Sequence, residues 1–178
     1  MTLLKWLGLG RESRAPEFDT LEAIEAALPD VDRSRRRYVA SFAYILARSA
    51  RADHEVTAEE SRAMEQLLCA HTGIRPERAA DVVRLAVAQG RRSGGTDDFV
   101  VTRMFDSLAT QDEKLALVDA LFAVTAVDAS IVTIEDNEIR RIANELRVEH
   151  GEYIAIRSRH LQHLAVLRAR QSPAAPSR

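Results

Sequence analysis

Four acidic residues lie in two matching short segments of the chain. In the first segment Asp53 is followed by Glu60, and in the second Asp128 is followed by Glu135, with the same spacing in both. Carboxylate oxygens are ligands that hard divalent cations prefer, and zinc also accepts them. If the fold brings the two segments together, these four side chains are candidate ligands for calcium, magnesium, manganese or zinc.

The match between the two segments continues into the flanking sequence at a constant offset of 75 residues. Apolar residues correspond in pairs on both sides of the acids: Leu46 with Leu121, Met64 with Ile139, and Leu67 with Ile142. Each acidic segment therefore lies between two patterns with helical spacing. The sequence predicts two helix–acidic turn–helix halves, at about residues 38–73 and 113–148. We expect a pseudo-two-fold axis between them, because duplicated hairpins bury equivalent faces.

The remaining chain also predicts helices. Gly and Pro are scarce, and no segment alternates apolar and polar residues in the manner of a strand. We expect an all-α fold, a compact bundle of about seven to eight helices without a sheet. The expected helices span about residues 20–28, 34–51, 58–70, 76–90, 97–108, 111–127, 133–146 and 149–170. In the fifth of these, the predicted inward residues are Phe99, Val100, Met104, Phe105 and Leu108.

An Ala-rich helix, an Asp, an aliphatic residue three positions later, a Glu and then an apolar helix form a pattern that resembles the TerB-like, tellurite-resistance family. The pattern occurs twice, over about residues 38–148. The resemblance implies an all-helical fold with two related halves, whose acidic turns converge on a metal site. The family's usual Asp-Gly pair is replaced here by Asp53-His54 and Asp128-Ala129. Both glycines, which most easily adopt a left-handed turn conformation, are therefore missing.

Helix capping offers a second explanation for the acids. Thr57 and Glu60 have the spacing of a capping box, in which each side chain bonds the backbone amide of the other residue. Thr110 and Glu113 have the same spacing outside the repeat. Glu60 can therefore be explained without a metal, and both explanations remain open. His54 is either a nitrogen ligand that compensates for the missing glycine or an exposed turn residue.

Length and composition suggest one domain with flanking segments. We expect an N-terminal amphipathic segment and linker at 1–18, a TerB-like helical domain at 19–170 and a disordered tail at 171–178. The net charge of −2 gives no general attraction to nucleic acid, so no nucleic-acid partner is expected. The lone Cys69 cannot form an internal disulfide, which fits a cytoplasmic protein.

The sequence favours a non-enzymatic protein. It contains no paired histidine spacing of a metal hydrolase and no recognised nucleophile motif. We expect a stress-response or protein-interaction module with an unknown protein partner and a divalent-metal site at the acidic turns. An alternative is a peripheral membrane adaptor, which would associate weakly through MTLLKWLGLG at the N-terminus and through Arg-rich patches such as Arg33–Arg37. A hydrolase that uses the four carboxylates is a further alternative.

Overall fold

Eight α-helices make up the structure of the described residues. The computed structural model describes residues 16–52, 56–92, 95–127 and 131–161. The helices are α1 (Pro16–Glu25), α2 (Arg33–Ala50), α3 (Ala58–Thr72), α4 (Pro76–Gly90), α5 (Gly95–Leu108), α6 (Gln111–Thr125), α7 (Thr133–Glu145) and α8 (His150–Arg159). This part of the chain contains no strand, and the predicted all-α fold is confirmed.

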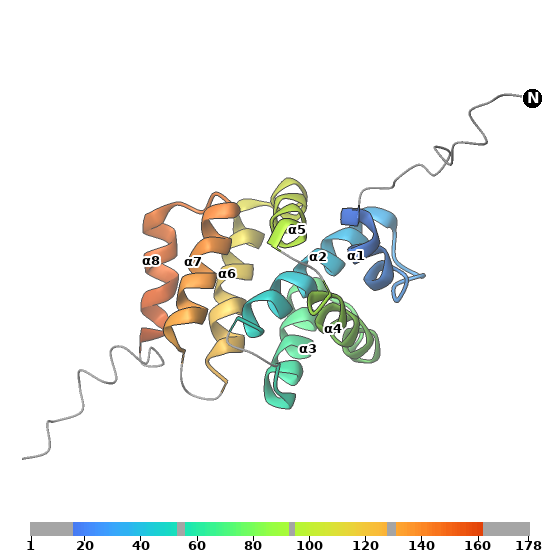
Figure 1. The fold of residues 1–178 in the computed structure, drawn as a ribbon, viewed down its shortest axis with the longest axis horizontal. Coiled ribbons are helices and arrows are strands. Elements are labelled where there is room, and N and C mark those ends of the chain that lie inside the picture. Colours follow the sequence, from blue (N-terminus) through green and yellow to red (C-terminus); the bar gives the residue numbers. More distant parts are fainter. Residues whose placement is uncertain (1–15, 53–55, 93–94, 128–130, 162–178) are drawn as a thin grey trace, which may run out of the picture.

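Helix α2 is the central element of the fold. It contacts α1, α3, α4, α5, α6 and α7. In Figure 1 it lies between α6, α7 and α8 on one side and α1, α3 and α4 on the other. Every residue from Tyr38 to Ala50 is buried. A helix can be surrounded in this way because the small side chains of Ala40, Ala43 and Ala47 allow neighbouring helices to approach closely.

The predicted repeat is present in the helix boundaries. Helices α2 and α6 end at Ala50 and Thr125, and α3 and α7 begin at Ala58 and Thr133, so both pairs differ by the 75-residue offset. The corresponding side chains Leu46, Leu121, Met64 and Ile139 are all fully buried. Helix α3 contacts α6 and α2 contacts α7, which are the reciprocal contacts that a pseudo-two-fold relation requires.

The repeat is longer than the hairpin that the sequence predicts. Helix α4 begins at Pro76 and packs on α2, and α8 begins at His150 and packs on α6. These starts differ from the 75-residue offset by a single position. Each half therefore contributes a third helix in an equivalent place.

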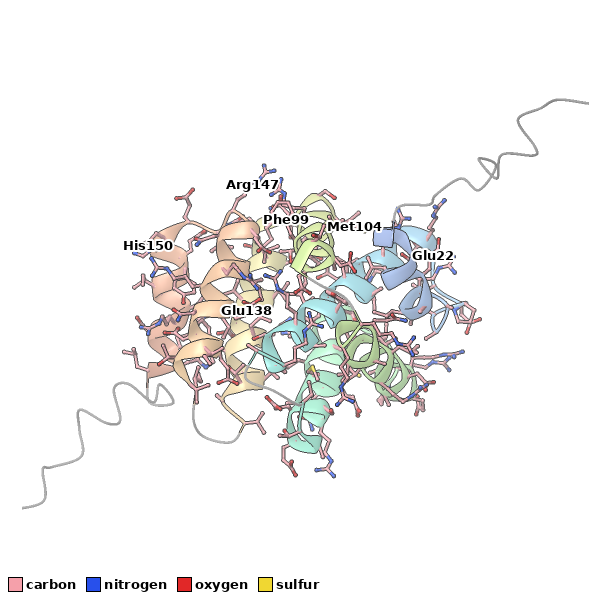
Figure 2. The ribbon with its side chains drawn as sticks, in the orientation of Figure 1. Glu22, Phe99, Met104, Glu138, Arg147 and His150 are labelled. Carbon is pink, nitrogen blue, oxygen red and sulfur yellow. The ribbon has the colours of Figure 1, made fainter. Side chains whose placement is uncertain are left out.

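The buried face of α5 differs from the predicted one. Phe105 is buried and Met104 is partly buried, as expected, but Phe99 is 51% exposed and Leu108 is 40% exposed. Figure 2 marks Phe99 and Met104 on this helix. The buried positions are instead occupied by Asp98, Val101, Thr102 and Phe105, which share one helical face. The prediction was wrong here because it used apolar residues alone, whereas α5 turns two polar residues inward.

Several predictions concern residues outside the described ranges. The N-terminal segment MTLLKWLGLG and the tail 171–178 lie outside them, so those expectations stay predictions. Helix α8 ends at Arg159 rather than near residue 170, although residues 162–170 are also outside the described part. Among the described helices, none is long and apolar enough to cross a membrane.

The contribution of the central core can be tested with two truncations. Leu121→Ala removes a fully buried side chain from α6 and should reduce the free energy of unfolding by about 2–5 kcal/mol, since it leaves a cavity. Ile134→Ala truncates a side chain that is 58% exposed and should change the free energy of unfolding by less than about 0.5 kcal/mol. Urea denaturation followed by circular dichroism measures both, and equal losses would contradict the assignment of the core.

Candidate functional site

The structure describes two of the four predicted metal ligands. Glu60 and Glu135 lie in the first turns of α3 and α7, whereas Asp53 and Asp128 lie outside the described residues. Glu60 is 9% exposed and Glu135 is 4% exposed. The two glutamates thus occupy equivalent buried positions in the two halves. How they lie relative to the two aspartates stays a prediction.

Glu60 forms the capping box expected from the sequence. Its Oε2 accepts hydrogen bonds from the Thr57 amide at 2.7 Å and from the Thr57 hydroxyl at 2.9 Å. The Glu60 amide in turn donates to Thr57 Oγ1 at 3.1 Å. None of the described residues donates a hydrogen bond to the other carboxylate oxygen, Oε1. Capping therefore fixes the orientation of the carboxylate through one oxygen and leaves the second without a described donor.

Glu135 keeps half of the same arrangement. Its Oε2 accepts from the amide of Val132 at 2.9 Å. Val132 corresponds to Thr57 but has no side-chain acceptor, so it cannot return a hydrogen bond to the Glu135 amide. The carboxylate is thus held at the helix start in both halves, although the Ser/Thr partner is present in one half alone.

Capping alone does not require these glutamates to be so deeply buried. Glu113 forms a complete capping box with Thr110, at 2.8 Å to the amide, at a more exposed position. Within the described residues, no three His, Cys, Asp or Glu side chains are arranged to hold a metal ion. Since two predicted ligands lie outside those residues, the metal site stays a prediction.

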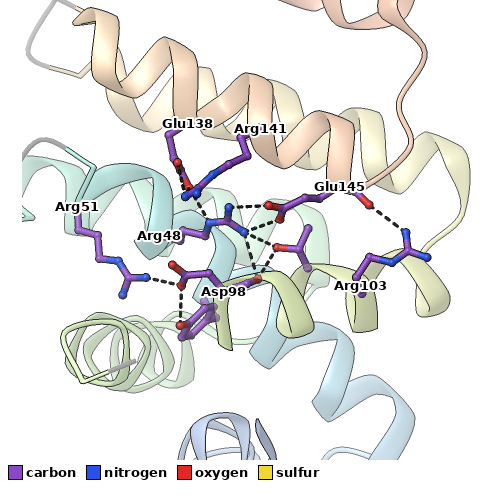
Figure 3. A network of polar contacts seen from close by, with 9 residues as sticks. Arg48, Arg51, Asp98, Arg103, Glu138, Arg141 and Glu145 are labelled. Carbon is purple, nitrogen blue, oxygen red and sulfur yellow. Dashed lines mark hydrogen bonds and ion pairs between the residues drawn. The ribbon is translucent and has the colours of Figure 1, made fainter. Parts of the chain in front are cut away.

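A buried polar network joins the two halves between α2, α5 and α7. Its centre is Arg48, which is 2% exposed. The guanidinium donates to Glu138 at 2.7 Å and to Glu145 at 2.7 and 3.1 Å. It also donates to the Thr102 hydroxyl at 2.8 Å and to the Asp98 carbonyl at 3.1 Å. Figure 3 shows the two carboxylates of α7 on one side of Arg48 and the groups of α5 on the other.

A second arginine, Arg51 at the C-cap of α2, extends the network toward the first acidic turn. Arg51 pairs with the carboxylate of Asp98, which also accepts a hydrogen bond from the Tyr44 hydroxyl at 2.8 Å. Arg48, Arg51, Asp98 and Glu138 line a shallow hollow of about 230 Å³. Because both arginines have carboxylate partners, the charges in this region are balanced.

The network lowers the pKa of Glu138. Burial alone raises this pKa, but the hydrogen bond from Arg141 and the charge and hydrogen bond of Arg48 outweigh burial. Figure 2 shows Glu138 on the side of α7 that faces α2. The carboxylate is therefore charged in the folded protein under neutral conditions, as its pairing with two arginines requires.

The network breaks the symmetry of the repeat. This difference between equivalent positions is visible in the sequence and could have revealed the network. At an offset of 75 residues, its members correspond to alanines: Arg48 to Ala123, Arg51 to Ala126, Asp98 to Ala23, Thr102 to Ala27, Glu138 to Ala63, and Glu145 to Ala70. The sequence prediction rested on the matching residues of the two halves, so it did not include these differing positions. The first half thus carries the arginines where the second has alanines, and the second half carries the glutamates where the first has alanines.

Removing the central charge should destabilise the protein strongly. Arg48→Ala leaves the partly buried Glu138 and Glu145 without their shared partner, so we expect a loss of about 3–5 kcal/mol in the free energy of unfolding. Arg62→Ala removes an arginine from an exposed pair with Glu59 and should cost less than about 1 kcal/mol. Urea denaturation compares the two variants. Similar small losses would show that the network contributes little to stability.

Stability should also depend on pH through Glu138. Its pKa in the folded protein lies below the ordinary glutamate value of 4.5, so its contribution to stability is present above that pH and is lost as the pH falls through the folded pKa. Glu138→Gln cannot lose a charge and should show a shallower fall in unfolding free energy on acidification below pH 4.5. Denaturation curves over a series of pH values measure this slope, and parallel curves for the two proteins would contradict the assignment.

Comparison with known proteins identifies the family of this helical fold. A family model described as "Tellurite resistance protein TerB" matches residues 39–158. No curated protein and no solved structure gives a significant match. The matched region contains both hairpins, both buried glutamates and the polar network, and it spans most of the sequence. The chain therefore belongs to the TerB family.

Proposed function

We propose that this chain is a non-enzymatic interaction module of the cytoplasmic stress response, whose partner binding responds to a divalent cation at the two acidic turns. The observation that carries the proposal is the equivalent burial of Glu60 and Glu135 in the two halves of a TerB-family fold. Buried carboxylates are unfavourable unless they are paired or coordinated. Both carboxylates already accept hydrogen bonds, and a cation shared by the turns would add coordination to them.

The carboxylate chemistry fits a hard cation. Glu60 is oriented through Oε2, and Oε1 has no hydrogen-bond donor among the described residues. Metal ligands are commonly oriented in this way by a second hydrogen bond. Asp53, Glu60, Asp128 and Glu135 would hold the ion, which would neutralise the repulsion among them.

Exposed apolar side chains beside the second turn support a protein partner. Val127 is 40% exposed just before the turn, and Ile134 is 58% exposed just after it. A cation that fixes the turn would fix the relative positions of these two side chains. We therefore place the partner surface at the start of α7, next to the proposed cation. Enzymatic activity is not part of the proposal, because the sequence offers no nucleophile or metal-hydrolase motif.

The cation can be tested with isosteric variants and a matched control. Titration calorimetry with calcium, magnesium, manganese and zinc should detect binding to the wild-type chain. Glu60→Gln and Glu135→Gln should weaken it by roughly tenfold or more, since each replaces a charged ligand while keeping an oxygen that can accept the capping hydrogen bond. Glu113→Gln makes the same change in the capping box outside the repeat and should bind like the wild type.

Two results would count against the proposal. One is the absence of binding of any of the four cations to the wild-type chain. The other is an equal loss of affinity in Glu113→Gln, which would show a general effect of charge rather than a site. Asp53→Asn and Asp128→Asn test the two turns in the same assay.

A further inference from the structure

A second, oppositely charged site lies at the other end of the α2–α3 hairpin. The connection between α1 and α2, the start of α2, the end of α3 and the start of α4 enclose a cavity of about 310 Å³. Three arginines, Arg35, Arg75 and Arg78, line it together with one acid, Asp30. The charged lining of the cavity is therefore positive overall.

Two of the three guanidinium groups are held in place by the protein. Arg35 donates to the carbonyl oxygen of Thr72 at 2.8 Å, and its guanidinium lies 4.7 Å from the centre of the Tyr38 ring. Arg78 pairs with Asp30 at 3.1 Å. Arg75 is exposed, and its side chain has no hydrogen-bond or ion-pair partner in the described part of the chain. Two fixed cations and one available cation thus face the same space.

The three arginines occupy positions that do not favour helix stability. Arg35 lies in the first turn of α2, Arg78 lies in the first turn of α4, and Arg75 is the N-cap residue of α4 without a side-chain capping bond. The positive end of a helix dipole disfavours cations, by about 0.3–1 kcal/mol at exposed positions. An anion in the cavity would reverse this effect, because it would interact favourably with both helix starts and with the guanidinium groups.

Three apolar side chains line the cavity as well, next to Thr72 and Gly73. Leu28 is buried in the core, and Val31 and Ile74 pack against it at the wall of the cavity. A bare inorganic anion would leave this surface without a partner. A ligand with both an anionic group and a hydrocarbon part uses the whole cavity.

We propose that this cavity binds the phosphate group of an amphiphilic phosphate ester. Arg35, Arg75 and Arg78 would contact the phosphate. The hydrocarbon part would lie against Leu28, Val31 and Ile74. Guanidinium groups bind phosphate oxygens through paired, charge-assisted hydrogen bonds. A soluble ester and the headgroup of an anionic lipid share this chemistry. The cavity lies at the far end of the hairpin from the acidic turns, so the proposal does not depend on a cation there.

Hexyl phosphate is a suitable probe, and inorganic phosphate is its comparison. We expect titration calorimetry to show hexyl phosphate binding to the full chain more tightly than inorganic phosphate by roughly tenfold or more, because burial of each methylene is favourable. Arg75→Ala should weaken hexyl phosphate binding by roughly tenfold through loss of a charge-assisted hydrogen bond. This variant should fold normally, since the side chain is exposed and has no described partner.

Two further variants sharpen the test. Arg84→Ala removes an exposed arginine from the same helix, where it pairs with Asp81, and should leave binding unchanged. Asp30→Asn removes the acid that competes for Arg78 and should strengthen binding. Failure of hexyl phosphate to bind at about 10 mM would overturn the proposal. So would an equal loss of binding in Arg84→Ala and Arg75→Ala.

Vesicles distinguish the two sources of the phosphate. Phosphatidylcholine vesicles with phosphatidic acid at about four to one should co-sediment with the chain if the ligand is a lipid headgroup, and Arg75→Ala should reduce this co-sedimentation. If hexyl phosphate binds in an Arg75-dependent manner without co-sedimentation, the ligand is a soluble ester. Both results support the cavity as the site. Co-sedimentation that Arg75→Ala leaves unchanged, without hexyl phosphate binding, would overturn it.

Discussion

The burial of Arg48 is the constraint on which the arrangement of the helices depends. Helix α2 carries this charge into the interior, and no residue of α2 balances it. Its carboxylate partners come from α7, and its neutral acceptors come from α5. A buried cation is tolerated when its partners are well placed, and it is costly when one of them is lost. The two halves of the chain must therefore dock in one register, in which Glu138 and Glu145, seven residues apart on α7, both reach α2.

The same network makes the two halves unequal. Their helix boundaries and apolar cores correspond, yet each charged residue of the network has an alanine at the equivalent position of the other half. If the two halves were identical, the helices of one half could take the places of those of the other with little change in the free energy of folding. The residues of α3 equivalent to Glu138 and Glu145 are alanines, so a packing with α3 in the place of α7 would leave Arg48 buried against alanine. The asymmetry thus specifies which helices contact one another, whereas the repeat gives the two halves their similar helix arrangement.

The central hairpin also separates two regions of opposite charge. The first acidic turn follows the end of α2, and the arginine-lined cavity lies at the start of α2. The rise of an α-helix places Arg35 and Ala50, the last residue of α2, about 22 Å apart along the axis. A cation at the turns and a phosphate at the cavity would therefore bind at opposite ends of the most buried helix of the fold. Since α2 contacts six other helices, either ligand would act on the element that holds the bundle together.

The sequence by itself determined the helices, the repeat and the capping boxes, because these follow from local spacing. The 75-residue offset predicted the pairing of Leu46 with Leu121 and of Met64 with Ile139, and all four residues are buried. The spacing of Thr57 and Glu60 likewise predicted a hydrogen bond within one helical turn. Only the tertiary structure decided the inward face of α5, the partners of Arg48 and the convergence of Arg35, Arg75 and Arg78 on one cavity. Those contacts join residues up to 97 positions apart, so their selection depends on how the helices pack and not on any local pattern.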